Sequence, residues 1–142
     1  MTLRTIDVLS TEECYELLHT QLVGRLAYVD DVGPAALPVN YAVIEHDIVF
    51  RVEADSVLRQ VIDHPVGFEV DKTDPEQSFG WSVLARGQAR HVPLDEVPGL
   101  LGVAHEEIPR PWAAGIHNIW IRIGVKEISG RRLSKPFSGL VF

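Results

Sequence analysis

The sequence is poor in cysteine and has no long run of apolar residues. Cys14 is the only cysteine, which excludes an internal disulfide and a zinc cluster held by several thiolates. No apolar run approaches the roughly 20 residues that a membrane-spanning helix needs. The first ten residues, MTLRTIDVLS, lack the basic and then apolar pattern of a signal peptide. These absences predict a cytoplasmic protein that does not enter a membrane.

Positive charge is also scarce. The 142 residues include 20 acidic and 13 basic ones, for a formal net charge of −7, and the longest basic cluster is Arg131-Arg132. Such a surface repels polyphosphate backbones, so neither nucleic acid nor an anionic membrane is an expected partner. Because 46% of the residues are hydrophobic, the chain can bury a core of its own. We expect a single domain over residues 1–142.

The motifs of several enzyme classes are missing. The six histidines include no His-Glu-x-x-His arrangement, so the sequence predicts no metal site. The stretch from Gly80 to Leu84 begins like the nucleophile elbow of a hydrolase but lacks the closing glycine, so Ser82 is not a predicted nucleophile. A P-loop and a Gly-x-Gly-x-x-Gly fingerprint are absent as well. We therefore predict no catalytic side chain, ATP site or Rossmann cofactor.

The sequence does contain a β-rich stretch from Gly24 to Ser56. Apolar residues separated by turn residues predict three short strands there, arranged as a β-meander. Pro38 falls within the second strand and cannot donate a ladder hydrogen bond, so that strand is expected at a sheet edge or at a bulge. Backbone groups beside Pro38 would then be available to a ligand.

The end of this stretch has the pattern of an anion site. Arg51 ends the third strand, and Ser56 is placed to cap a helix that reaches Ile62. A guanidinium beside a helix N-terminus can bind phosphate oxygens. The alternative is that Arg51 is a solvated surface residue and Ser56 is only a helix cap.

Two further helices are predicted. The stretch from Leu9 to Gln21 has apolar residues at helical spacing and a capping box formed by Ser10 and Glu13, with Gly24 as its stop. The Pro- and Gly-rich connection after residue 92 is expected to hold a short helix within residues 94–103.

Three more strands are predicted in the second half of the chain, over residues 66–70, 81–92 and 119–125. Gly87 is expected at a bulge. Ile128 breaks the alternation of the last strand, so an extra residue near Lys126 is expected to form a bulge or bend. About six strands with almost no β-α-β alternation predict a mainly β fold, an antiparallel barrel with peripheral helices.

Six segments occur in an order that is typical of one protein family: GRLAY, AALPVNYAV, IVFRV followed by Ser56, VGFEVD, GWSVLARGQA and ISGRRL. In these segments the chain resembles the FMN-binding split-barrel family of pyridoxamine 5'-phosphate oxidase-like proteins. The resemblance spans Leu9 to Leu133 and is strongest to the short subgroup that includes nitroimidazole-resistance-type proteins. It implies a split β-barrel that forms a homodimer, with flavin mononucleotide (FMN) in a groove between the two subunits.

The resemblance also implies which residues meet the cofactor. Arg51 corresponds to the phosphate-binding arginine of the family, and Ser56 to a hydroxyl in the phosphate loop that follows. Two other segments correspond to the backbone along the isoalloxazine ring and to a part that closes on the cofactor: Pro38, Val39, Asn40 and Tyr41, and then Trp81 and Ser82.

The sequence departs from the family pattern at the expected phosphate site. Val52 and Val57 stand where the family commonly has a hydroxyl residue and a lysine, and Glu53 and Asp55 add negative charge nearby. These differences predict weak FMN binding, another cofactor such as a deazaflavin or haem, or loss of the cofactor. The C-terminal sequence SGRRLSKPFSGLVF lacks the Arg-Leu-x-Pro type motif of true pyridoxamine-phosphate oxidases, so that activity is not expected.

Two functions are compatible with this resemblance. The first is a flavin-dependent oxidoreductase that reduces a small organic molecule such as a nitroaromatic compound or a quinone, with the chemistry carried by the cofactor. The second is a protein without turnover that binds or senses a flavin, a haem or another planar ligand in the same groove. Val52 and Val57 favour the second function or a change of cofactor. The first is favoured by Arg51, the stretch from Pro38 to Tyr41, and Trp81-Ser82.

Overall fold

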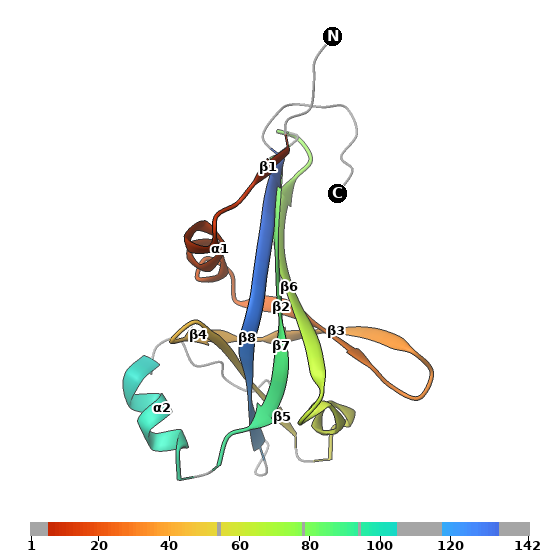
Figure 1. Ribbon diagram of the computed structural model, residues 1–142, viewed down its shortest axis with the longest axis vertical. Helices are drawn as coiled ribbons and strands as arrows, with labels where there is room; N and C mark the ends of the chain where they lie inside the picture. Colours follow the sequence, from red (N-terminus) through yellow and green to blue (C-terminus); the bar gives the residue numbers. More distant parts are fainter. Residues whose placement is uncertain (1–5, 54, 78, 94, 105–117, 134–142) are drawn as a thin grey trace.

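The computed structural model describes residues 6–53, 55–77, 79–93, 95–104 and 118–133 (Figure 1). The helices are α1 (Thr11–Leu18), the 3-10 helix η1 (Val57–Val61) and α2 (Val97–Ala104). The strands are β1 (Ile6–Val8), β2 (Val23–Val29), β3 (Pro34–Asn40), β4 (Ala42–Ile44), β5 (Asp47–Glu53), β6 (Pro65–Asp74), β7 (Phe79–His91) and β8 (Asn118–Leu133). The predicted mainly β class is confirmed, with eight strands in the described part of the chain rather than about six.

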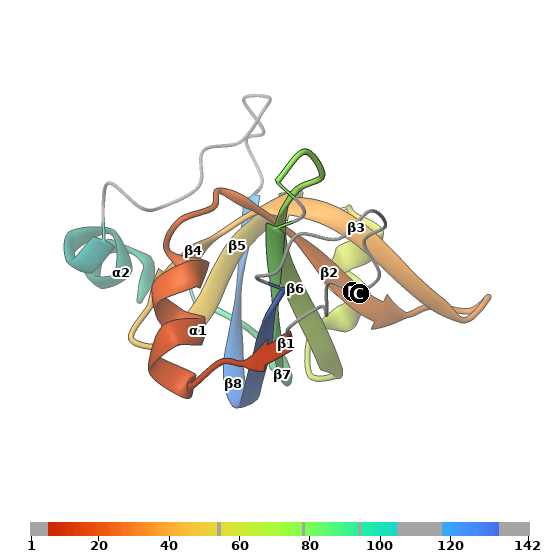
Figure 2. The same ribbon diagram turned by 90° about the horizontal axis from the view of Figure 1, so that it is seen from above.

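One antiparallel sheet contains all of these strands. Their order is β3-β2-β6-β7-β8-β5-β4, and β1 pairs with the far end of β8. Seen along the long axis, the sheet curls around a common interior, with α1 and α2 outside it (Figure 2). β8 is the longest strand, with 16 residues, and it pairs with β1, β5 and β7. The antiparallel barrel that the sequence predicts is therefore present.

The predicted meander is divided between the two ends of the sheet. β3 pairs with β2 and β4 pairs with β5, so the expected second strand is split at Tyr41. Because β3 and β4 follow one another in the chain but stand at opposite ends of the strand order, the chain itself joins the two ends of the sheet. The three-strand meander was wrong for this reason. The edge position expected for Pro38 is confirmed, since β3 pairs with β2 alone among the described strands.

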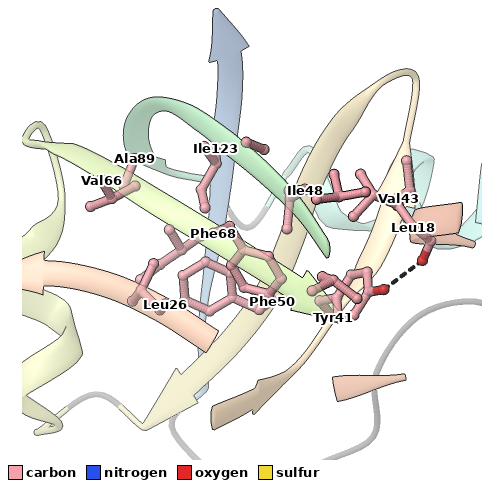
Figure 3. Close-up of a cluster of buried hydrophobic side chains, with 14 of the residues drawn as sticks. Leu18, Leu26, Tyr41, Val43, Ile48, Phe50, Val66, Phe68, Ala89 and Ile123 are labelled. Carbon is pink, nitrogen blue, oxygen red and sulfur yellow. Dashed lines mark hydrogen bonds between the residues drawn. The ribbon is translucent and has the colours of Figure 1, made fainter. Parts of the chain in front are cut away.

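Inward-facing side chains of the curled sheet form one main core (Figure 3). Phe50 and Phe68 lie at its centre with ring centroids 6.3 Å apart, and the Tyr41 ring meets Phe68 edge-on at 5.1 Å. The Tyr41 hydroxyl donates a hydrogen bond of 2.5 Å to the carbonyl oxygen of Leu18, which satisfies its buried polar atom. A smaller cluster on the other face of the sheet joins α2 to β5 and β8: Ile44, Val49, Val92, Leu100 and Trp120.

The first helix is shorter than predicted, because it spans Thr11–Leu18 rather than Leu9 to Gln21. Ser10 and Glu13 form the expected capping box, with distances of 3.0 and 3.1 Å between backbone nitrogens and side-chain oxygens. Gly24 does not stop this helix, because it lies inside β2. A Cβ atom on Gly24 would come within 2.3 Å of the Phe68 ring, so this glycine is needed for core packing. No helix in the described part of the chain is long and apolar enough to cross a membrane.

The two bulges expected near Gly87 and Lys126 are the same bulge, a single shift in the register between β7 and β8. The β7–β8 register runs from Arg86 opposite Glu127 to Gly87 opposite Val125, so Lys126 is the extra residue. A Cβ atom on Gly87 would lie 2.0 Å from the carbonyl oxygen of Gly124. Both predictions are confirmed, and they have a common cause in the close approach of the two backbones.

Candidate functional site

Arg51 projects from β5 on the face opposite the main core. Its neighbours Phe50 and Val52 point into that core, whereas Arg51 lies opposite Trp120 of β8. The guanidinium carbon is 4.9 Å from the centroid of the Trp120 ring, which is a cation–π contact. Arg51 is half-buried, and burial lowers the pKa of its guanidinium. A partly desolvated cation of this kind gains more from a bound anion than an arginine in bulk water would.

Ser56 caps η1 at the end of the same strand. Its side-chain oxygen accepts a hydrogen bond of 3.2 Å from the backbone N–H of Leu58, and its own backbone N–H donates to the carbonyl oxygen of Glu53. The hydroxyl proton remains available to donate to a ligand. β5 ends at Glu53 and η1 begins at Val57, so Arg51 and Ser56 belong to one local corner of the fold. This arrangement fits a phosphate group held by a guanidinium and a hydroxyl.

The two unusual valines of this corner differ in orientation. Val52 is buried in the main core, on the face of β5 opposite Arg51, while 57% of Val57 is exposed at the start of η1. A hydroxyl at position 52 would therefore face apolar side chains rather than a ligand beside Arg51. Only Val57 occupies a position from which a longer, charged side chain could reach such a ligand.

The end of β3 offers a ligand mainly backbone groups at the edge of the sheet, and few reactive side chains. Pro38 is exposed, Val39 and Asn40 are half-buried, and Tyr41 is buried in the main core. Burial raises the pKa of the Tyr41 hydroxyl, which is bonded to Leu18. The backbone N–H of Tyr41 donates to the carbonyl oxygen of Leu22. Tyr41 is therefore a packing residue, and Val39 also packs against the main core. Pro38 is the exposed residue of this segment.

Trp81 and Ser82 point to opposite faces of β7. Trp81 is only 3% exposed and packs in the main core, whereas Ser82 is half-buried on the outer face. Ser82 lines a pocket of about 300 Å³ together with side chains and backbone of β6, β7 and β8: Glu69, Asp71, Thr73, Trp81, Val83, Leu84 and Arg131. Of the two predicted residues, Ser82 is the one whose side chain is accessible to a ligand.

A charged cluster beside this pocket was not among the sequence predictions. A guanidinium nitrogen of Arg25 on β2 lies 3.1 Å from a carboxylate oxygen of Glu69 and 2.9 Å from one of Asp71. Burial, together with the Asp71 carboxylate, raises the pKa of Glu69 to about 7, although Arg25 acts in the opposite direction. The signal for this cluster was the alternation of Glu69 and Asp71 with the core residues of β6.

The charged cluster around Arg25 lies on the outer face of the sheet, between the segment that contains Pro38 and the segment that contains Ser82. Pro38, Arg25, Glu69 and Leu84 are successive register partners across β3, β2, β6 and β7. Pro38 and the pocket beside Ser82 therefore lie along one row of the sheet.

Arg51 lies away from the Ser82 pocket along β8. It is the register partner of Trp120 near the start of β8, whereas Ser82 is the partner of Arg131 near its end. These two β8 residues are eleven positions apart, which corresponds to a path of about 35 Å along an extended strand. Arg51 and Ser56 thus share one corner of the fold, and Pro38 and Ser82 share one row of the sheet. Within a single chain, Arg51 and Ser82 lie beside opposite ends of β8.

Within the described ranges, no group of three or more histidine, cysteine, aspartate or glutamate side chains is placed to hold a metal ion. His105 and His117 fall outside those ranges.

Comparison with solved structures identifies proteins of the same fold. An FAD-binding protein from Mycobacterium smegmatis has 32% sequence identity and a TM-score of 0.78, over 90% of this chain and 98% of its own. An FAD- and haem-binding protein from the same organism has 19% identity and a TM-score of 0.70, over 93% and 75% of the two chains. A putative 5-nitroimidazole antibiotic resistance protein from Bacteroides thetaiotaomicron has 10% identity and a TM-score of 0.70, over 95% and 93%.

The resemblance seen in the sequence agrees with these structures. The predicted split-barrel fold and the likeness to nitroimidazole-resistance-type proteins are both confirmed. Residues 10–132, which include every candidate site residue discussed above, match the pyridoxamine 5'-phosphate oxidase family. The chain belongs to this family.

Proposed function

We propose that this chain binds a flavin and acts as a flavin-dependent oxidoreductase of a small organic substrate. The observation that carries the proposal is the corner of β5 and η1, where the half-buried Arg51 and the Ser56 hydroxyl are placed to hold a phosphate. FMN is the proposed cofactor because it presents one terminal phosphate to such a corner. The FAD-binding protein of Mycobacterium smegmatis, at 32% identity, supports a flavin in this fold.

We further propose that the flavin lies between two copies of the chain. Arg51 and Ser82 occupy different ends of β8, and a homodimer allows the phosphate corner of one copy to face the Ser82 pocket of its partner. Isologous contacts of this kind would give two equal sites per dimer.

The roles of the residues follow from their placement. Arg51 and Ser56 would bind the phosphate, the backbone of the β3 edge from Pro38 to Asn40 would flank the ring, and Ser82 would meet the cofactor from the partner copy. A bound flavin supplies hydride or single electrons to an organic acceptor. The protein supplies position and an environment with restricted access to water.

A second candidate function is binding without turnover. The exposed Val57 lacks the positive charge that the family commonly places there, and Glu53 and Asp55 lie near the proposed phosphate. Both features weaken the attraction of a dianionic phosphate. Such a protein would store or sense a planar ligand, and a deazaflavin or a haem are the alternatives to FMN.

The test is a visible absorption titration of the purified protein with FMN and, separately, with FAD. We expect saturable uptake by the wild type, and we expect Arg51→Ala to weaken it by roughly ten- to a hundredfold, because a charge-assisted hydrogen bond contributes about 1.5–3 kcal/mol. Arg86→Ala is the matched control, since Arg86 is an exposed arginine that pairs with Glu127 on another part of the surface.

Three outcomes separate the candidates. Uptake that weakens with Arg51→Ala but not with Arg86→Ala supports the phosphate corner. Equal affinity in all three proteins would show that the phosphate lies elsewhere. Uptake of flavin without reoxidation of the reduced form by quinones or nitroaromatic compounds would favour the binding protein over the enzyme.

A further inference from the structure

The pocket beside Ser82 combines groups of opposite charge around a small apolar floor. Its volume of about 300 Å³ is at the lower end of the range for ligand sites. Glu69 and Asp71 of β6 and Arg131 of β8 line the pocket, and Ser82 of β7 is the register partner of both Asp71 and Arg131. Arg131 makes no ion pair with the described residues, whereas both carboxylates share Arg25. The pocket can therefore accept a small organic molecule that presents an electron-rich oxygen to Arg131.

We propose that this pocket binds the reducible substrate, a quinone or another conjugated carbonyl compound, and that Glu69 is the residue that delivers a proton to it. This inference rests on the proposed function and extends it, because the flavin chemistry alone assigns no source for that proton. Arg131 would hold one carbonyl oxygen of the substrate, and Glu69 would protonate the oxygen that becomes a hydroxyl.

The reaction balances with the groups named. When bound, a reduced flavin would supply the quinone with a hydride equivalent, that is two electrons and one proton, and would itself be oxidised. The O–H bond of the Glu69 carboxylic acid breaks, its proton forms an O–H bond on the quinone oxygen, and a hydroquinone leaves. The Glu69 carboxylate then takes a proton from water.

The surroundings of Glu69 suit a proton donor at neutral pH. The charged groups that face it are Arg25 from β2, Asp71 from its own strand and Arg131 from β8, while Ser82 and Leu84 of β7 are uncharged. Burial and the like charge of Asp71 raise the pKa of Glu69 to about 7. A carboxyl group in this range holds its proton in part of the molecules at neutral pH and can release it to a substrate.

Two substitutions should shift the titration midpoint of Glu69, the pH at which half of its carboxyl groups are protonated, in opposite directions. Asp71→Asn removes a neighbouring negative charge, so the midpoint of Glu69 should fall. Arg25→Gln removes a neighbouring positive charge, so the midpoint should rise. Glu69→Gln keeps the size of the side chain and removes the acid, and Glu127→Gln is the matched control on an exposed glutamate that pairs with Arg86.

The first experiment follows the carboxyl carbon of Glu69 by NMR in protein without flavin, with the signal assigned by its loss in Glu69→Gln. We expect a midpoint near pH 7 in the wild type and in Glu127→Gln, a lower midpoint in Asp71→Asn and a higher one in Arg25→Gln. A wild-type midpoint at the ordinary glutamate value of about 4.3 would overturn the inference.

The second experiment uses flavin-loaded protein reduced with stoichiometric dithionite and mixed with 1,4-naphthoquinone in a stopped-flow instrument from pH 5.5 to 8.5. The reoxidation rate should fall as the pH rises through the titration midpoint of Glu69 in each protein that retains this residue. Glu69→Gln should be reoxidised at least roughly tenfold more slowly than the wild type at pH 6, and its rate should not fall with rising pH. An unchanged pH profile in Glu69→Gln would refute the proton donor while leaving the flavin proposal intact. Failure of the wild type to take up any flavin would refute both.

Discussion

Glu69 connects the stability of the folded chain to pH. Its pKa of about 7 in the fold lies above the value of about 4.3 for a glutamate in an unfolded chain. The resulting stabilisation is fully present below about pH 4 and is lost as the pH rises through 7. We therefore expect the free energy of unfolding of Glu69→Gln, relative to the wild type, to be higher at pH 8 than at pH 5, as measured by urea denaturation at both values.

The same measurement on Glu127→Gln is the control for this prediction, because that glutamate is exposed on the surface. A relative stability of Glu69→Gln that is equal at pH 5 and pH 8 would show that Glu69 titrates alike in the folded and unfolded chains.

Substitutions of the two valines near the proposed phosphate site should have different effects on FMN affinity and stability. Val57→Lys should strengthen FMN binding by about tenfold, because an exposed lysine at the start of η1 adds one charge-assisted hydrogen bond. Val52→Thr should give no gain and should cost about 1–2 kcal/mol of stability, because it places a hydroxyl among apolar core residues. Absorption titration and urea denaturation measure the two effects. A gain in affinity from Val52→Thr would contradict the orientation of that side chain.

Side-chain direction explains what the sequence could and could not predict at the site. Arg51 and Ser56 could be predicted as one corner of the fold because a strand end followed by a helix cap is a local pattern. Trp81 and Ser82 were assigned together to the cofactor, although successive residues of a strand point to opposite faces. Alternation along β7 places Trp81 in the core and leaves Ser82 outside.

The bulge between β7 and β8 depends on the absence of a side chain at Gly87. A Cβ atom there would lie 2.0 Å from the carbonyl oxygen of Gly124, so the two strands would have to separate. We expect Gly87→Ala to lower the free energy of unfolding by about 2–3 kcal/mol. Gly124→Ala is the matched control, since nothing lies within 4 Å of a Cβ at that position. Equal losses in the two variants would mean that strand propensity, rather than the close approach, sets the cost.

The elements were largely predictable because their signals are local. A break in alternation at Ile128 was sufficient to locate the extra residue at Lys126. The split of the second strand at Tyr41 was not predictable, because the same residues alternate in one phase on both sides of the break while their partners change from β2 to β5. Pairing partners depend on how the whole sheet curls, which no local pattern contains.

At the scale of the whole molecule, the proposed flavin site requires two copies. Arg51→Ala and Ser82→Leu should each weaken FMN uptake when tested alone. If the groups belong to different copies, unfolding and refolding the two variants together should restore about a quarter of the sites, because mixed dimers contain one intact site. Light scattering should give twice the chain mass of 15.8 kDa for each sample. A mixture that takes up no more FMN than the separate variants would assign both groups to one chain, or to different ligands.

The position of β8 has a consequence for synthesis in the cell. This strand pairs with β1, β5 and β7, yet it follows all of them in the chain. While residues 118–133 are still inside the ribosome, the edges of β5 and β7 that will receive β8 have no partner, and the apolar faces of both strands are exposed. The barrel can close only after translation has passed β8, so the nascent chain has to be protected from aggregation until that late step.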